Sequence, residues 1–333
     1  MIAQIDKNYV KSRFWKVWSR MVSYALFEGR PITTKGQWIN PLVFFLFSLH
    51  KRFPQLRRIK EPIFILGTGR SGTTILGVVL SVHKDVGFLN EPKALWHSIF
   101  KDEDLIGSYS LNNARYRLSS EDASSDVKKN AHRLFSSYLS FSLSNRVVDK
   151  YPELLFRVPF VKSIFPDAKF LFLVRNGFET CASIDNWSSR LGEKVDGAIH
   201  DWWGVDRRKW SLLVNQIVPE HPDLLPYCQD MKSWNRHTDM AAVEWIVSMR
   251  EGLKLVNDYP NDILRVDYES LCREPRTELL KICDFANLDK NDATFFDYGQ
   301  KVLRERNLKP PLDLDEAILY PFLDTMRSLG YEC

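Results

Sequence analysis

The chain has 333 residues, of which 44% are hydrophobic and 26% are charged, and its net charge is +4. This is an ordinary globular composition, long enough for one large α/β domain or two small ones, and we expect one large domain. The five cysteines show neither a C-x-x-C pair nor a metal-ligand spacing, so we expect reduced thiols, a cytoplasmic protein and no bound metal. They are Cys181, Cys228, Cys272, Cys283 and Cys333.

Basic residues are concentrated at the start of the chain. Residues 1–60 contain twelve Lys or Arg and two acidic residues, a balance of +10, so the remainder carries −6. In this segment, six apolar residues fall on one face of a predicted helix and three basic residues fall on another. The apolar residues are Val10, Phe14, Val17, Trp18, Met21 and Ala25, and the basic residues are Arg13, Lys16 and Arg20.

Two interpretations of residues 1–60 remain open. A basic amphipathic helix with tryptophans can lie on an anionic membrane face, here the inner membrane surface. Alternatively, the segment packs on the rest of the protein and its basic residues form a solvated face. The apolar run 42–49 is far shorter than the ~20 residues of a spanning helix, and the charges scattered through residues 1–30 do not fit a cleavable signal. A nucleic-acid partner is not expected, because the rest of the chain is net acidic and lacks an aromatic-basic repeat.

A glycine-rich turn follows the apolar run 63–66 and precedes the apolar segment 75–80. Residues 67–74 read Gly-Thr-Gly-Arg-Ser-Gly-Thr-Thr. A strand, a glycine turn and a helix build an anion site, because backbone N–H groups converge at the helix N-terminus. The loop of a nucleoside triphosphatase has a lysine where this chain has Thr73, and Arg70 lies inside the loop. The candidate ligand contacts in this loop are Gly69, Arg70, Ser71, Gly72, Thr73 and Thr74.

The rest of the chain alternates between strand and helix patterns, which predicts an α/β fold with a P-loop-like parallel sheet flanked by helices. Residues 191–232 and 293–333 are expected to be irregular, the first rich in tryptophan and the second carrying a basic cluster. That cluster is Lys301, Arg304, Arg306 and Lys309. The predicted strands are 63–66, 86–89, 146–150, 170–174 and 263–267, and the predicted helices are 72–82, 94–100, 127–143, 152–164, 177–190, 239–259 and 274–286.

Polar residues stand at the ends of four predicted strands. Glu91 follows 86–89, Lys150 ends 146–150, Arg175 follows 170–174 and Tyr268 follows 263–267. Such ends are where α/β sheets bind ligands. A Walker B strand ends in aspartate, so Arg175 indicates a second anion site instead of a metal, with Ser183 on the following helix. Two anion sites on successive strand ends fit a nucleotide with phosphates at both ends of its ribose.

The chain resembles sulfotransferases that use 3′-phosphoadenosine 5′-phosphosulfate (PAPS), from about residue 62 to residue 288. The glycine loop resembles the family's loop for the 5′-phosphosulfate. Arg175 and Ser183, eight positions apart, resemble its 3′-phosphate motif, and residues 267–271 resemble its tyrosine-glutamate segment. The arginine in the loop makes the chain more similar to the branch with protein-tyrosine sulfotransferases and many bacterial enzymes than to the branch with a loop lysine.

The resemblance implies a role for each site residue. Glu91, twenty-one positions after Arg70, matches the base of the arginine branch, and Lys150 matches the lysine that stabilises the transition state. Arg70 shares that stabilisation, and Tyr268 approaches the adenine. Each residue also has a structural alternative: a surface ion pair for Glu91, an exposed turn for Lys150 and a structural ion pair for Arg175.

These features predict a basic segment over 1–60 and a sulfotransferase domain over 61–333. The expected reaction moves a sulfuryl group from PAPS to a hydroxyl or amine of a small-molecule, carbohydrate or lipid acceptor such as a glycolipid. The tryptophans of 187–234 either contact that acceptor or pack in the core. A P-loop kinase or nucleoside triphosphatase is the enzyme alternative, disfavoured by the missing loop lysine and strand-end aspartate. A non-catalytic nucleotide- or membrane-binding protein is the alternative from another class.

Overall fold

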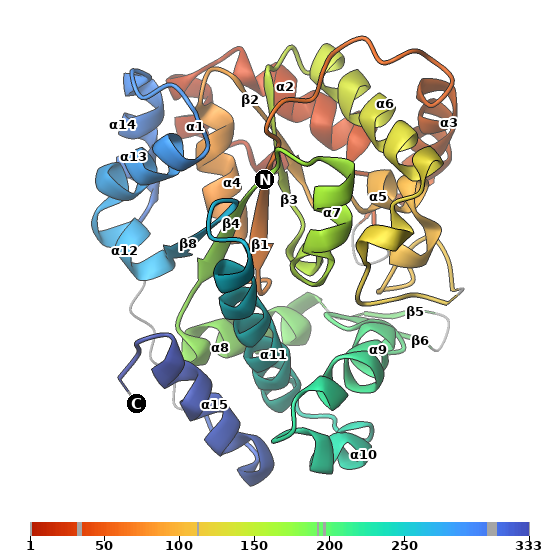
Figure 1. Ribbon diagram of the computed structural model, residues 1–333, viewed down its shortest axis with the longest axis vertical. Coiled ribbons are helices and arrows are strands. Elements are labelled where there is room, and N and C mark those ends of the chain that lie inside the picture. Colours follow the sequence, from red (N-terminus) through yellow and green to blue (C-terminus); the bar gives the residue numbers. More distant parts are fainter. Residues whose placement is uncertain are drawn as a thin grey trace.

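A five-stranded parallel sheet forms the centre of the molecule (Figure 1). The computed structural model describes residues 2–31, 35–111, 113–191, 193–195, 198–304 and 312–332. Neighbouring strands pair in parallel in the order β2-β3-β1-β4-β8. All five C-terminal ends therefore meet at one edge, and the predicted α/β fold with a parallel sheet is confirmed. The strands are β1 (Ile63–Gly67), β2 (Val86–Asn90), β3 (Arg146–Lys150), β4 (Lys169–Val174) and β8 (Ile263–Asp267).

Helices cover both faces of the sheet because its central strands are apolar on both sides. Ile63 and Ile65 of β1 pack in the cluster formed with α4, α13 and α14, whereas Phe64 and Leu66 pack in the cluster formed with α5, α6, α7 and α11. Alternate residues of one strand thus build two separate cores. These helices are α4 (Thr73–Val82), α5 (Lys93–Ile99), α6 (Ser125–Phe141), α7 (Val158–Ile164), α11 (His237–Asp258), α13 (Pro275–Phe285) and α14 (Ala293–Val302).

The remaining helices lie at the two ends of the chain and beside the C-terminal edge of the sheet. They are α1 (Lys7–Ser12), α2 (Lys16–Val22), α3 (Asn40–His50), α8 (Gly177–Leu191), α9 (Arg208–Gln216), α10 (Cys228–Met231), α12 (Tyr268–Arg273) and α15 (Glu316–Ser328), with short helical turns η2 (Ser23–Phe27) and η6 (Pro152–Arg157). None of the described helices has the length and apolarity needed to cross a membrane.

Two segments that were expected to be irregular contain helices or strands among their described residues. Residues 191–232 contain the antiparallel strands β5 (Glu193–Val195), β6 (Ala198–Asp201) and β7 (Gly204–Val205), and also α9. Strands of two to four residues are too short to give a period-2 pattern. Residues 293–333 contain α14 and α15, the second with Pro321 inside it, a residue that normally argues against a helix. Of the predicted basic cluster, Arg306 and Lys309 lie outside the described residues.

The N-terminal segment packs on the sheet with its basic face inward. Arg13, Lys16 and Arg20 are buried, whereas Phe14 and Trp18 are exposed. The segment thus packs on the rest of the protein, as the second interpretation expected, but Arg13, Lys16 and Arg20 do not form a solvated face. Sequence periodicity shows which residues share a face, but it does not show which face meets the protein.

The buried basic residues satisfy the outer edge of β2. An edge strand leaves alternate backbone groups without a partner strand. Lys16 Nζ donates to the Val86 carbonyl at 2.8 Å, and Arg20 donates to the Phe88 carbonyl at 2.6 Å. The Asn90 N–H donates to a carboxylate oxygen of Glu28 at 2.9 Å. Side chains of the N-terminal segment thus replace a sixth strand.

Candidate active site

The glycine loop between β1 and α4 has the geometry of an anion site. Gly67, Arg70 and Gly72 have positive φ angles of 139°, 69° and 99°, which turn the chain sharply into α4. At Gly72 a side chain is excluded, because a Cβ atom there would lie 2.4 Å from the Tyr268 ring. The first N–H groups of α4, from Thr73 onward, have no acceptor within the helix, and the buried Thr68 hydroxyl has no hydrogen-bond partner among the described residues. These donors fit a bound anion.

The sheet brings the predicted site residues together along its C-terminal edge. In the order of the strands, Glu91 follows β2, Lys150 ends β3, Arg70 follows β1, Arg175 follows β4 and Tyr268 follows β8. The five strands therefore contribute one residue each, with the glycine loop in the middle. The chain runs from β1 to one side through α4 and β2, and later returns to the other side as β4, so the loop lies where parallel sheets place ligands.

Glu91 and Lys150 form one half of this row. The Glu91 N–H donates to the Lys150 carbonyl at 2.7 Å, and Lys150 Nζ pairs with Glu91 Oε1. Glu91 has a φ of 49°, a backbone conformation that costs about 1–3 kcal/mol in residues other than glycine. The Lys150 side chain is 3% exposed and that of Glu91 is 34% exposed, so the carboxylate can be reached from outside.

Charge keeps Glu91 ionised. Partial burial favours the neutral acid, but the ammonium groups of Lys150 and Lys93 outweigh this effect and lower the pKa of Glu91. Glu91 is therefore a carboxylate at neutral pH and can accept a proton.

Arg70, Ser183, Arg175 and Tyr268 form the other half of the row. Arg70 Nε donates to Ser183 Oγ at 3.1 Å, and an Arg175 nitrogen donates to the Arg70 carbonyl at 3.1 Å. The Arg175 guanidinium lies 4.5 Å from the centroid of the Tyr268 ring, within cation–π range. Arg175 also pairs with Glu179 at 2.6 Å, a partner that sequence reasoning missed, so an anion bound there must compete with this carboxylate.

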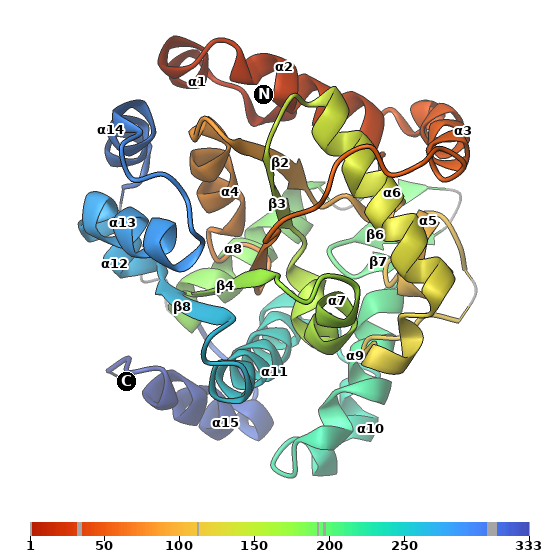
Figure 2. The ribbon, with the colours of Figure 1, turned by 45° about the horizontal axis from the view of Figure 1, so that its top comes forward.

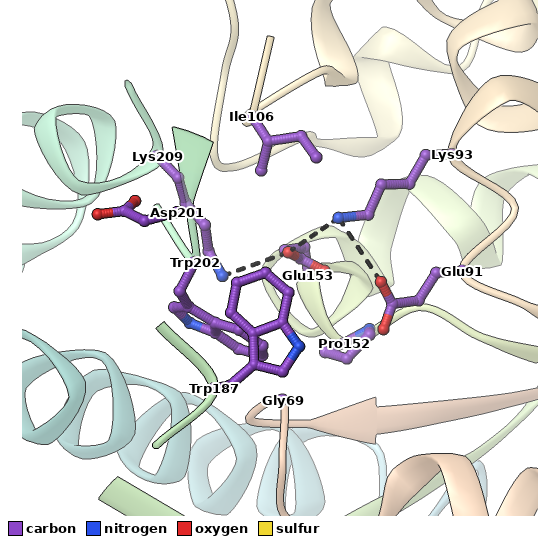
Figure 3. A pocket seen from close by; sticks show the side chains of 10 residues that line it. All are labelled: Gly69, Glu91, Lys93, Ile106, Pro152, Glu153, Trp187, Asp201, Trp202 and Lys209. Atoms are coloured by element: carbon purple, nitrogen blue, oxygen red, sulfur yellow. Dashed lines mark ion pairs between the residues drawn. The ribbon is translucent and has the colours of Figure 1, made fainter. Parts of the chain in front are cut away.

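A small cavity of about 70 Å³ lies between Glu91 and the glycine loop (Figure 3). Trp202 packs against the loop so closely that a Cβ atom on Gly69 would lie 2.5 Å from its ring. Trp187 stands against Trp202, with the two ring centroids 5.3 Å apart. The cavity is lined by Gly69, Glu91, Lys93, Ile106, Pro152, Glu153, Trp187, Asp201, Trp202 and Lys209.

A chain of alternating charges runs along this cavity from Glu91 (Figure 3). Lys93 Nζ lies 3.7 Å from Glu91 and 3.8 Å from Glu153. Lys209 Nζ lies 3.3 Å from Glu153 and 2.6 Å from Glu244. Burial alone would raise the pKa of Glu153, but Lys93 and Lys209 lower it to about 2. The chain of ion pairs therefore stays charged at neutral pH.

Trp202 joins this charge chain to the glycine loop, because its ring nitrogen donates to Glu244 at 2.9 Å. Sequence reasoning missed Lys93, Glu153, Lys209 and Glu244. Lys93 and Glu153 follow Glu91 and Lys150 by two and three positions, but single charges at helix starts usually belong to the surface. The tryptophans of 187–234 were expected either to contact the acceptor or to pack in the core. Trp187 and Trp202 line the cavity, whereas Trp203 and Trp210 are buried in the core.

Comparisons with known proteins find similarity to sulfotransferases. Residues 62–217 match the model of the Sulfotransferase family. The chain is 25% identical to the protein-tyrosine sulfotransferase of Drosophila melanogaster over 254 residues, 75% of this chain and 42% of that protein. It is 23% identical to protein-tyrosine sulfotransferase A of Caenorhabditis elegans over 234 residues, 69% of this chain and 50% of that protein. The chain thus spans about half the length of these two curated relatives.

Solved structures with similarity to the chain include a sulfotransferase domain from the curacin biosynthetic pathway. The alignment has a TM-score of 0.47 and 15% sequence identity, and it covers 83% of this chain and 99% of that domain. The family match covers the glycine loop, Glu91, Lys150, Arg175 and Ser183. The family match spans just under half of the chain, and over that stretch the chain is similar to sulfotransferases, as it is to these relatives.

Proposed function

We propose that the chain is an enzyme that transfers the sulfuryl group of PAPS to a hydroxyl, or an amine, of an acceptor. The observation that carries this proposal is the row of residues along the sheet edge, with the Glu91–Lys150 ion pair on one side of the glycine loop and the Arg175–Tyr268 contact on the other. On one side of the loop, the carboxylate and the ammonium can take part in the reaction. On the other side, the arginine and the aromatic ring can hold the far end of a nucleotide.

In this proposal the donor lies across the middle of the row. The backbone amides of residues 69–74, which include the first residues of α4, bind the 5′-phosphosulfate. Arg175 and Ser183 bind the 3′-phosphate through charge-assisted hydrogen bonds, and Tyr268 contacts the adenine. The Thr68 hydroxyl has no hydrogen-bond partner within the described part of the chain, which supports an anion at the loop. The approach of Arg175 to the loop carbonyl supports a single ligand spanning both sites.

The transfer step needs no metal in this scheme. Glu91 accepts the proton of the acceptor hydroxyl while that oxygen forms a bond to sulfur. The bond between sulfur and the 5′-phosphate oxygen breaks, and its electron pair stays on the phosphate. Lys150 and Arg70 stabilise the charge on the sulfuryl and phosphate oxygens. The products are a sulfate ester, adenosine 3′,5′-bisphosphate and the proton on Glu91.

The cavity beside Glu91 restricts the acceptor. A volume of about 70 Å³ is far below the roughly 300–1,000 Å³ of a pocket that encloses a whole small molecule. We infer that the acceptor inserts a terminal hydroxyl and leaves its remainder outside. The indole rings of Trp187 and Trp202 line the cavity and suit the apolar face of a sugar ring or an alkyl chain, so the proposed acceptor is a carbohydrate or lipid. Buried thiols at Cys181, Cys228 and Cys283 support a reducing, cytoplasmic setting.

Titration calorimetry tests the donor. We expect adenosine 3′,5′-bisphosphate to bind without added metal, and ATP with Mg²⁺ to bind at least tenfold more weakly. Transfer of radiolabelled sulfate from PAPS to a panel of sugars, lipids and phenols then tests catalysis. Tight binding of ATP–Mg²⁺ with no heat from the bisphosphate would instead support a kinase or nucleoside triphosphatase. Binding without transfer to any acceptor would favour a non-catalytic nucleotide-binding protein.

A further inference from the structure

The N-terminal segment exposes a row of large apolar side chains, here called the aromatic surface. Trp15 and Phe14, just before α2, are 66% and 73% exposed. Large exposed apolar areas on a protein normally mark a contact with a partner or a membrane. The members of the aromatic surface are Phe14, Trp15, Trp18, Met21, Trp38, Leu42, Phe45, Leu49, Phe53, Leu56, Phe141 and Leu143.

Phe141 makes this surface continuous between α2 and α3. The ring nitrogen of Trp18 donates to the Phe141 carbonyl at 3.0 Å. On the other side, the rings of Phe141 and His50 of α3 have centroids 5.3 Å apart. Figure 2 shows α2, the end of α6 and α3 at the same end of the molecule. The exposed residues of these three elements therefore face solvent at one end of the protein.

The exposure is built into the fold, because Arg13, just before α2, and Lys16 and Arg20 of α2 hold the helix in this orientation. Arg13 pairs with Asp292, Lys16 donates to Val86, and Arg20 pairs with Glu28. Arg20 is 1% exposed. A rotation of α2 that hid its aromatic residues would break all three of these contacts. The aromatic residues are held outward by bonds to the sheet edge.

In the part of the N-terminal segment that the structure describes, the exposed charges are all basic, which favours an anionic partner. Six basic side chains of the segment are exposed, and among its described residues 2–31 and 35–60 no acidic side chain is exposed. Arg52 and Arg58 flank Phe53 and Leu56 in sequence, and Lys11 lies one turn before Phe14. The exposed basic residues are Lys7, Lys11, Lys35, Arg52, Arg58 and Lys60.

We propose that the aromatic surface inserts into the interface of an anionic lipid bilayer. Tryptophan and phenylalanine side chains bury in the boundary between headgroups and acyl chains, and neighbouring lysines and arginines pair with anionic headgroups. A protein partner with an apolar face would not require the surrounding excess of exposed cations. The inserting face is the aromatic one, which reverses the simple picture of a basic helix face lying on the membrane. None of its residues lines the cavity beside Glu91, so the inference stands apart from sulfuryl transfer.

Sedimentation of the full chain with vesicles tests this surface. The vesicles contain equal parts of phosphatidylglycerol and phosphatidylcholine, with pure phosphatidylcholine vesicles as the comparison. We expect binding to the anionic vesicles that weakens as salt rises, and weaker binding to the neutral ones. Two double variants, Phe14→Ser with Trp15→Ser and Leu42→Ser with Phe45→Ser, should each lower the partition coefficient by roughly tenfold, because such binding scales with inserted apolar area.

A matched control removes apolar side chains at another place. Leu319→Ser with Tyr320→Ser changes two exposed residues of α15, which lies at the opposite end of the molecule from α2 (Figures 1 and 2). This variant should bind like the unmodified chain, and all variants should keep the thermal midpoint because the altered side chains are exposed. No binding by the unmodified chain, or an equal loss in the control, would overturn the proposal. A dimer that the Phe14 and Trp15 variant dissociates, without vesicle binding, would assign the surface to a second copy instead.

Discussion

Glu91 combines a positive φ with two nearby ammonium groups, and both features follow from its place after β2. The turn at Pro92 sends the chain into α5, whose first residue Lys93 returns toward the carboxylate. Lys150, on the neighbouring strand, approaches from the other side. A carboxylate between two lysines is strongly oriented, at the cost of basicity. Such an arrangement suits a base whose position matters more than its proton affinity.

The first prediction concerns Glu91 itself. Glu91→Gln keeps the shape and removes the charge, so transfer from PAPS should fall by about 10²–10⁴-fold in kcat/KM, while the affinity for adenosine 3′,5′-bisphosphate changes little. Single-turnover transfer and calorimetry measure the two effects separately. Glu121→Gln, at an exposed position on the polar segment before α6, is the control and should have no effect on either. Full activity in Glu91→Gln would mean that another group removes the proton.

Lys93 gives a second prediction, about pH. Because Lys93 lowers the pKa of Glu91, Lys93→Met should raise that pKa and move the acidic limb of the kcat/KM profile to higher pH. A variant that is merely less stable would lower activity without moving the limb. Lys232→Met, at an exposed lysine, should leave the profile unchanged. An unmoved limb in Lys93→Met would show that Lys93 does not act on the base.

The same substitution has a consequence for stability. The pKa of Glu153 is about 2 in the folded protein against an ordinary 4.5. A lowered folded-state pKa contributes stability that is fully present above about pH 4.5 and is lost as the pH falls toward about 2. Lys93→Met lacks part of this contribution and should therefore be less stable than the unmodified chain at pH 5. The difference between their free energies of unfolding should become smaller as the pH falls from 5 to 3. Urea unfolding at both values measures it, and a constant difference would contradict the linkage.

At the scale of elements, the sequence predicts the strands of the central sheet but neither the three short strands β5, β6 and β7 nor the orientation of α2. The central strands appear in the sequence as apolar runs, 63–66 and 170–174, and these runs predict strands whatever their neighbours. The amphipathic pattern around α2 was also recognised, but its buried face is the basic one. The reason is that β2 is an edge strand, whose carbonyl groups at Val86 and Phe88 need donors. Sequence periodicity does not reveal which strand lies at the edge.

The hydrogen bonds from α2 to the edge strand β2 lead to a prediction about stability. Arg20 is buried, pairs with Glu28 and donates to the Phe88 carbonyl. Arg20→Met leaves both acceptors without this donor and should destabilise the protein by about 3–5 kcal/mol. Lys11→Met, at an exposed lysine of α1, should change the free energy of unfolding by less than about 0.5 kcal/mol. Urea denaturation of the two variants compares them, and equal stabilities would mean that α2 is dispensable for the sheet edge.

For the whole molecule, strand order creates the site. All five residues of the row could be singled out from the sequence, but their order along the edge depends on which strands pair, and this is set by tertiary packing. The charge chain depends on still longer connections, because Glu153 meets Lys209 and Lys209 meets Glu244. The cavity wall is thus formed by segments that are separated by dozens of residues and lack a shared motif.

Ligand binding across the sheet edge should therefore stabilise the entire fold. The proposed site draws on residues after all five strands. Because adenosine 3′,5′-bisphosphate would bind only the folded protein, a concentration of 100 times its dissociation constant should add about 2.7 kcal/mol to the free energy of unfolding. The thermal midpoint should rise by roughly 4 °C. Arg175→Ala removes the guanidinium stacked on Tyr268 and should abolish this rise at the same ligand concentration, whereas Arg273→Ala, on the exposed end of α12, should retain it. Differential scanning calorimetry measures all three proteins. An undiminished rise in Arg175→Ala would show that Arg175 does not contribute to binding of the bisphosphate.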